Sequence, residues 1–168
     1  MGKAVVALLA AVLAAGTLAF AGEIEVHEKK VADVEAATAR FRGQYEEVGK
    51  YMEALYATAG EAIAGPCFAL YHEGDTEEGH DIEACVPVSA DVEGEGISTR
   101  TIPGANVIYT IHRGAYGPAL GETWGELMAY IQDNGLVIAG PAREVYLEWN
   151  PDDPEKYVTE LQVPLEKK

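Results

Sequence analysis

The sequence predicts an α+β fold in which two copies of a strand–helix–strand–strand unit pair into one antiparallel sheet with both helices on one face. Four landmark segments occur twice in the same order, and two stretches have the period of an amphipathic helix. Strand-like runs joined by Gly, Asp, Asn and Pro surround each helical stretch. The 168 residues, 48% of them apolar, can bury the core of a single domain.

The duplication is visible from residue identities alone. The first copy contains FRGQY (41–45), IAGP (63–66), LYHE (70–73) and EACVP (83–87), and the second contains HRGAY (112–116), IAGP (138–141), VYLE (145–148) and ELQVP (160–164). The offset grows from 71 at the first pair to 77 at the last, which short loop insertions explain. Residues of about 23–90 and 95–165 are therefore expected to form one supersecondary unit each.

The first 21 residues have the pattern of an export signal. Lys3 precedes an apolar stretch from residue 4 to 20, and Ala19-Phe20-Ala21 fits the small-x-small rule for cleavage. We expect cleavage after Ala21, which leaves residues 22–168 as a periplasmic or extracellular domain. The alternative is an uncleaved membrane anchor, because about 17 apolar residues are at the lower limit for crossing a bilayer.

Each helical stretch has apolar residues every three or four positions. They are Val48, Met52, Leu55, Tyr56 and Ala59 in the first copy, and Leu120, Trp124, Leu127, Met128 and Ile131 in the second. This spacing puts them on one face of a helix. Pro118 before the second stretch and Asn134-Gly135 after it are typical of the start and the end of a helix.

Eight further runs are predicted to be strands. They are residues 23–29, 33–41, 66–72 and 81–88 in the first half, and 97–101, 105–112, 141–149 and 157–164 in the second. Residues 73–79 and 150–154 are expected to be hairpin connections. One unit alone cannot bury a sheet face, so we expect the two units to pair edge to edge around a pseudo-twofold axis, with a groove between the helices.

The charge of the chain excludes one class of partner. The formal net charge is -16, and it becomes about -17 once Lys3 is removed with the signal. An acidic surface repels phosphate backbones, so we expect no nucleic acid partner. The same field would attract a cationic ligand.

The sequence has two cysteines, which could form a disulfide, and four histidines, which could bind a metal ion. Cys67 and Cys85 would face each other in a hairpin that pairs Tyr71 with Asp81, so a disulfide is possible; the alternative is two buried small apolar side chains. The histidines, at positions 27, 72, 80 and 112, lack the spacing of a zinc site. We therefore expect no metal and no cofactor.

The second copy resembles the GyrI-like domain. The resemblance is carried by LGETWGEL (120–127), Gly135, Gly140-Pro141, EVYL (144–147) and residues 160–164, and it covers about residues 23–165. That domain is also the effector-binding module of AraC-type and multidrug-sensing regulators, and it shares its fold distantly with the SOUL haem-binding group. The resemblance implies a pocket between the paired units for bulky aromatic or cationic compounds, with the carboxylate of a Glu-x-Tyr motif, here Glu144-Val145-Tyr146, near the positive charge.

Five residues are the ligand-binding candidates: Glu144, Tyr146, Tyr109, Trp124 and Tyr71. Glu144 and Tyr146 share one face of a strand by alternation. Tyr71 is the repeat-mate of Tyr146, while Ala69 stands at the position equivalent to Glu144, so one acid remains. The alternatives are that Glu144 is solvated on an open sheet face and that Trp124 only anchors its helix. Tyr45 and Tyr116 are expected to serve packing.

The leading hypothesis is a non-catalytic protein that binds a small aromatic or cationic compound outside the cytoplasm. Some GyrI-like members look like hydrolases of cyclopropane-containing natural products, so the first alternative is a hydrolase in which Glu144 is the catalytic residue. The second alternative is a protein-interaction module whose groove takes a peptide or a partner helix. The sequence predicts no oligomeric state.

Overall fold

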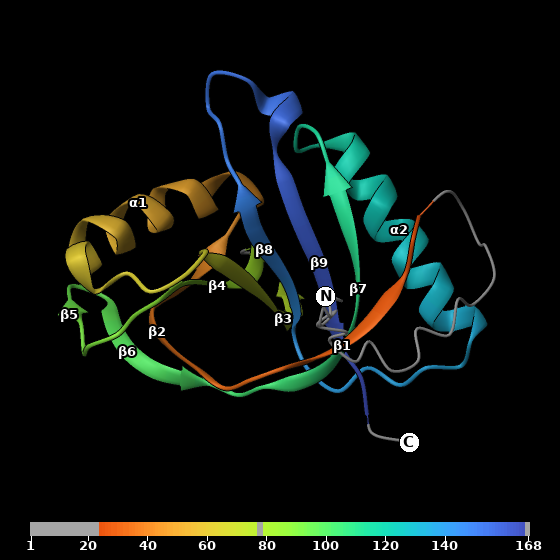
Figure 1. Cartoon of the computed structure of the whole chain (residues 1–168), viewed down its shortest axis with the longest axis horizontal. Coiled ribbons are helices and arrows are strands. Elements are labelled where there is room, and N and C mark those ends of the chain that lie inside the picture. The colour runs from red at the N-terminus through yellow and green to blue at the C-terminus, as the bar shows by residue number, and fades with distance from the viewer. Residues whose placement is uncertain (1–23, 77–78, 167–168) are drawn as a thin grey trace, which may run out of the picture.

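A computed structural model describes residues 24–76 and 79–166 and shows nine strands and two α-helices in that part of the chain (Figure 1). The helices are α1 (Val48–Ala59) and α2 (Pro118–Asp133). The strands are β1 (His27–Val31), β2 (Val34–Gly43), β3 (Phe68–Thr76), β4 (Gly79–Pro87), β5 (Glu93–Gly94), β6 (Ile97–Ile102), β7 (Ala105–Arg113), β8 (Ala142–Glu148) and β9 (Val158–Pro164).

All nine strands belong to one antiparallel sheet with the order β1-β7-β9-β8-β3-β4-β2-β6-β5. The first unit supplies β2, β4 and β3, and the second supplies β8, β9 and β7. The two units meet where β3 pairs with β8, with Phe68 opposite Val145 and Ala69 opposite Glu144. The predicted pairing of two units edge to edge is confirmed.

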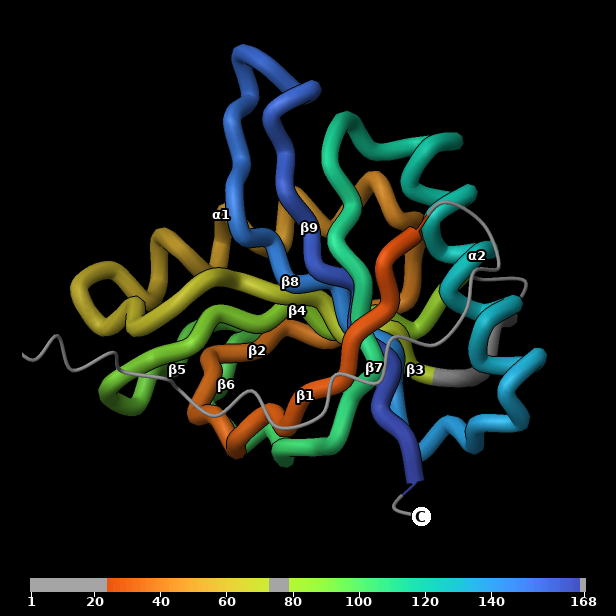
Figure 2. The backbone as a smooth tube through the Cα atoms, turned by 45° about the vertical axis from the view of Figure 1, so that its right-hand side comes forward, coloured from red at the N-terminus to blue at the C-terminus, as the bar shows by residue number. Residues whose placement is uncertain are grey.

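The outer strands are exchanged between the units. β1 precedes the first unit but pairs with β7 of the second, and β6 precedes the second unit but pairs with β2 of the first. Figure 2 shows β1 beside β7. The predicted first strand, residues 23–29, is placed too early, since β1 runs from His27 to Val31. This exchange ties each half of the chain to the other through backbone hydrogen bonds.

Both helices pack on the same face of the sheet. α1 contributes Met52 and Leu55 to a core with Ala84 of β4, and α2 contributes Leu127 to a core with Leu161 of β9. Cross-strand partners point to one face, and the register connects Ala84 to Ala69, Ala69 to Glu144 and Glu144 to Leu161. Glu144 therefore lies on the helix-bearing face. Figure 1 shows its strand, β8, between α1 and α2.

The ends of α2 follow the sequence signals. Gly117, with φ 106°, turns the chain before Pro118, the first helical residue. At the other end, Gly135 has φ 59° and Leu136 N–H donates to the carbonyl oxygen of Ile131. A left-handed glycine directly after the helix satisfies carbonyl groups of the last turn. The predicted start and end of this helix are confirmed.

The predicted hairpin register in the first unit is wrong by one residue. Tyr71 pairs with Ile82 and Phe68 pairs with Cys85, so Cys67 has no place opposite Cys85. Successive side chains on a strand point to opposite faces, which puts Cys67 in the core under α1 and Cys85 in the core on the other face. Both cysteines are buried free thiols. The structure therefore shows the alternative, two buried small side chains, and not the possible disulfide.

The face opposite the helices carries two buried carboxylates, and each is paired with a partly exposed arginine. Arg40 donates to both carboxylate oxygens of Asp81 at 2.8 Å, and Arg100 donates to both oxygens of Glu83 at 2.8 and 2.6 Å. His72 Nε2 lies 2.9 Å from the Glu83 carboxylate. Hydrogen bonds from Arg40 lower the pKa of Asp81. Burial by itself would raise the pKa of Glu83, but the bonds from Arg100 and His72 outweigh it and the pKa is lowered.

Acid is expected to destabilise the fold through these two carboxylates. A carboxylate whose pKa is lower in the folded than in the unfolded chain stabilises the fold above its unfolded pKa. That contribution is lost as the pH falls through the folded value. The free energy of unfolding should therefore decrease below about pH 4, as measured by urea denaturation at pH 7 and pH 3. Asp81→Asn should reduce the difference between the two pH values; an equal difference would contradict the assignment to Asp81.

The predicted export signal, residues 1–21, lies outside the residues that the structure describes. Across residues 24–76 and 79–166, no helix combines the length and the apolar character needed to cross a membrane.

Candidate functional site

The site is built around one buried carboxylate on β8. Glu144 is 7% exposed, and its two oxygens accept three hydrogen bonds. Trp124 Nε1–H donates to Oε1 at 2.8 Å, while the hydroxyl groups of Tyr71 and Tyr146 donate to Oε2 at 2.7 and 3.0 Å. An ionised carboxylate is an acceptor only, so this set of donors matches its charged form. The alternative of a solvated glutamate on an open sheet face is not what the structure shows.

The pairing of β3 with β8 brings the two tyrosines together. Ala69 lies directly opposite Glu144, and each strand carries a tyrosine two residues further along, on the same face. The hydroxyl oxygens of Tyr71 and Tyr146 are 3.4 Å apart. Because Ala69 is small, repeat-mates from both halves of the chain reach the same carboxylate. The site therefore lies at the pseudo-twofold axis and contains a single acid.

Two more tyrosines stand outside this pair in matching positions. Tyr45 meets Tyr71 edge to face with ring centroids 5.6 Å apart, and Tyr116 meets Tyr146 in the same way at 6.0 Å; both interplanar angles are 65°. Their exposed fractions are 54% for Tyr45 and 39% for Tyr116. The sequence predicted a packing role for both, whereas the structure places them at the rim of the site. The repeated R-G-x-Y segment was the signal that could have identified them. We call Glu144, Trp124 and these four tyrosines the Glu144 cluster.

Three tyrosines of the cluster, Tyr71, Tyr146 and Tyr116, remain neutral at physiological pH. Burial raises the pKa of Tyr71 and of Tyr146 well above the usual value, and nearby Glu144 raises both further. Burial also raises the pKa of Tyr116 to about 12. The formal charge of the cluster is then that of Glu144 alone. A single negative charge surrounded by half-buried aromatic rings is an arrangement suited to an organic cation.

The structure does not bring Tyr109 to this cluster. Tyr109 pairs with Gln162, whereas Glu144 pairs with Leu161, so the two side chains point to opposite faces of the sheet. On its own face the Tyr109 ring lies 4.5 Å below Lys29 Nζ and 5.4 Å from the His27 ring. Four of the five predicted site residues are together, and Tyr109 is separated from them by strand alternation.

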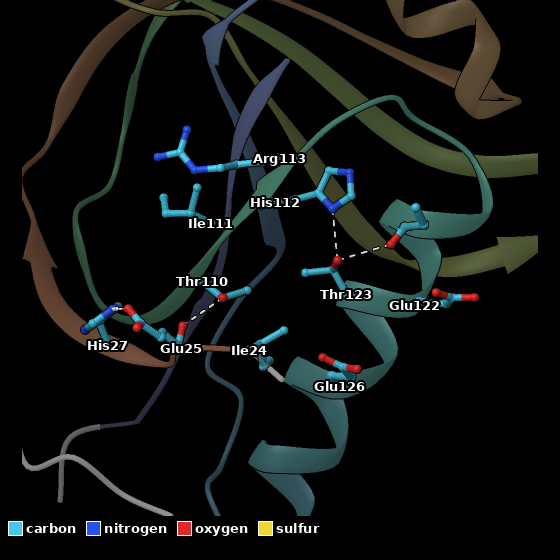
Figure 3. A pocket seen from close by; sticks show the side chains of 11 residues that line it. Ile24, Glu25, His27, Thr110, Ile111, His112, Arg113, Glu122, Thr123 and Glu126 are labelled. Atoms are coloured by element: carbon cyan, nitrogen blue, oxygen red, sulfur yellow. Dashed lines mark hydrogen bonds and ion pairs between the residues drawn. The ribbon is translucent and has the colours of Figure 1, made fainter. Parts of the chain in front are cut away.

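A surface hollow lies elsewhere in the described part of the chain. It has a volume of about 620 Å³ and is bounded by β7, the start of α2 and the segment before β1 (Figure 3). Within it, His112 Nδ1 lies 2.9 Å from Thr123 Oγ1, and Thr110 donates to the carbonyl oxygen of Glu25. The described residues that line it include no phenylalanine, tyrosine or tryptophan. A second hollow of about 460 Å³ lies beside residues 138–141.

Glu144 borders neither of these hollows, because its own hydrogen-bond donors cover it. The groove expected between the helices therefore does not coincide with either of them. Among the described residues, no three His, Cys, Asp or Glu side chains gather as they would around a metal ion.

Comparison with known proteins agrees with the architecture. The EcmrR C-terminal domain is 26% identical with a TM-score of 0.75, over 88% of this chain and 100% of that one. EcmrR in its DNA complex is 27% identical with a TM-score of 0.74, and the match covers 86% of this chain but 58% of EcmrR. The structure of SAV2435 bound to tetraphenylphosphonium is 14% identical with a TM-score of 0.57, over 84% and 95% of the two chains, and shows the fold alone.

No curated protein matches the chain by sequence. The family model of the GyrI-like small molecule binding domain matches residues 24–166, which include both repeats, both helices and the whole Glu144 cluster. The chain therefore belongs to the GyrI-like family of small-molecule-binding domains.

Proposed function

We propose that this GyrI-like domain binds an aromatic organic cation at the Glu144 cluster. The observation that carries the proposal is a buried carboxylate that three donors hold in place and that aromatic rings surround. Location outside the cytoplasm is part of the proposal and rests on the pattern of residues 1–21.

The two parts of the cluster favour the same ligand. The attraction between Glu144 and a cation is stronger in a partly dehydrated site than in water, because the effective dielectric constant is lower. Tyrosine faces add about 0.5–2 kcal/mol each when a cation lies over them. The net charge of -16 raises the local concentration of cations around the protein.

Binding requires the inner rings to move. The hydroxyl groups of Tyr71 and Tyr146 both donate to Oε2 of Glu144 and so lie against the carboxylate. A cation that reaches the carboxylate must turn at least one of them aside, at a cost of about 1.5–3 kcal/mol for the lost hydrogen bond to a charged group. The exposed rings of Tyr45 and Tyr116 give the ligand its first contact surface.

Tetraphenylphosphonium and tetraphenylborate test the proposal because they have nearly the same shape and opposite charge. Tetraphenylphosphonium is the compound bound in the SAV2435 structure. In isothermal titration we expect saturable one-to-one binding of the cation and at least about tenfold weaker binding of the anion, which corresponds to about 1.4 kcal/mol. Equal affinity for the two ions would show that apolar contact alone drives binding and would contradict the proposal.

Turnover separates binding from hydrolysis, the alternative in which Glu144 activates water. Incubation with cyclopropane-containing electrophiles, followed by mass spectrometry, separates the two: more than one product molecule per protein molecule would establish the hydrolase. A peptide that binds with higher affinity than any small cation would instead favour the interaction module.

A further inference from the structure

The aromatic rings of the Glu144 cluster continue onto the hairpin that joins β8 and β9. Tyr116 contacts Tyr157 with ring centroids 4.8 Å apart, and Tyr157 in turn stacks with Trp149 at 6.4 Å and 26°. Tyr157 is 8% exposed, whereas Trp149 is 63% exposed. Together with the contact between Tyr116 and Tyr146, these pairs form an unbroken series of rings from Glu144 to the protein surface.

The series differs between the two halves of the chain. In the first half Tyr45 stacks on His80 at 4.1 Å, and His80 is the repeat-mate of Tyr157. The alignment of residues 70–76 with 145–151 puts Gly74 at the position of Trp149. Glycine has no side chain, so the ring series reaches a tryptophan only in the second half. The acid is also retained only in the second half, at Glu144.

Trp149 is held in place by its neighbour. Single exposed apolar side chains are common on protein surfaces and need no function. Trp149 differs because it stacks on a buried ring that belongs to the same series as the binding site. A ring that is already positioned loses little conformational entropy when a ligand stacks on it. Figures 1 and 2 show that the connection between β8 and β9 projects beyond the neighbouring strands.

The charges on the same hairpin are mostly negative. Glu148, Asp152 and Glu155 are exposed there, and Lys156 forms an ion pair with Asp153 at 2.8 Å. An anionic group would be repelled from this part of the surface, while a neutral or positively charged one would be accepted.

We infer that the binding site extends from Glu144 to Trp149, and that its ligand is an elongated organic cation with a second aromatic group that stacks on the Trp149 ring. This inference rests on the proposed function, because the charged end of the ligand is the end that binds at Glu144. Beyond the proposed function, the inference specifies that the ligand is elongated and that it lies on the side of the pseudo-twofold axis that carries the β8–β9 hairpin.

Two probes of different length test the inference. Benzyltrimethylammonium has one ring beside its charge, and dequalinium has two cationic ring systems joined by a long chain. Trp149→Ala should weaken dequalinium binding roughly five- to tenfold, which is the effect of one lost aromatic contact. It should leave the affinity for benzyltrimethylammonium within about twofold. The matched control is Leu147→Ala, an exposed apolar residue of β8 outside the ring series, which should change neither affinity.

Fluorescence gives a second measurement that does not depend on affinity. The sequence has two tryptophans, and Trp149→Ala leaves Trp124 as the only one, so the difference in emission between wild type and this variant reports Trp149. Dequalinium should quench its emission on binding, and benzyltrimethylammonium should not. If both probes bind the wild-type protein but Trp149→Ala affects neither and Trp149 emission stays constant, the extension is wrong and the proposed function stands. If neither probe binds the wild-type protein, both are wrong.

Discussion

Glu144→Gln is expected to weaken tetraphenylphosphonium binding about 10- to 100-fold while the protein stays folded. The substitution removes one negative charge at close range from the cation, a loss of roughly 1.4–2.8 kcal/mol in a site of intermediate dielectric constant. Glutamine has nearly the same shape as glutamate. The carbonyl oxygen of glutamine can accept the hydrogen bond from Trp124, whose ring N–H can only donate. The amide N–H groups can donate to Tyr71 and Tyr146, because a hydroxyl group can rotate and accept instead of donating.

Glu148→Gln is the matched control for that variant. Glu148 belongs to the same strand and is exposed, so its substitution changes the net charge equally without touching the cluster. Isothermal titration should show an affinity within about twofold of wild type, since exposed charges are screened by salt. Equal losses in the two variants would mean that the overall acidic field, and not the buried carboxylate, attracts the ligand.

Arg100→Ala is expected to reduce the free energy of unfolding by about 1–3 kcal/mol, because it leaves the buried Glu83 carboxylate without its main partner, while solvent partly screens the 42% exposed Arg100 side chain. Glu83 is 2% exposed, and Arg100 donates to both of its oxygens. Without Arg100, the buried Glu83 carboxylate keeps the contact with His72 but loses its main partner. A buried charge that has lost its main partner is unfavourable. Urea denaturation at pH 7 measures the change.

An exposed ion pair provides the comparison for Arg100. Lys156→Ala breaks the pair with Asp153, whose side chains are 69% and 40% exposed, and should cost at most about 1 kcal/mol. The double variant Glu83→Leu with Arg100→Leu removes both charges and should recover part of the loss. A single Arg100→Ala variant as stable as Lys156→Ala would contradict the structural role of the Glu83 pair.

Much of the architecture was predictable because the two halves repeat their local signals. The helices, the strand order within each unit and the joining of the units follow from periodicity, from Pro118 and Gly135, and from the need to bury a sheet face. The exchange of β1 and β6 was not predictable in this way, since pairing between distant strands leaves no local pattern in either strand.

The errors in the predicted site also concern strand register and side-chain direction, for which the sequence has no local signal. The hairpin register was wrong by one residue, since the alternation of residues along β3 and β4 does not specify which residues pair across them, and a slip of one residue moves Cys85 to the face opposite Cys67. Tyr109 was expected on the site face, but alternation along β7 directs it to the other. Tyr45 and Tyr116 lie in the turns that come after β2 and β7, where no sequence periodicity indicates which way a side chain points.

A crystal structure of the protein with tetraphenylphosphonium would test cation binding at Glu144 most directly. We predict the phosphonium within about 6 Å of the Tyr71 or Tyr146 ring, next to the Glu144 carboxylate, with at least one of these tyrosines turned away from it. A cation seated instead in the hollow beside Glu122 and Glu126, with every hydrogen bond to Glu144 intact, would contradict the assignment of the site.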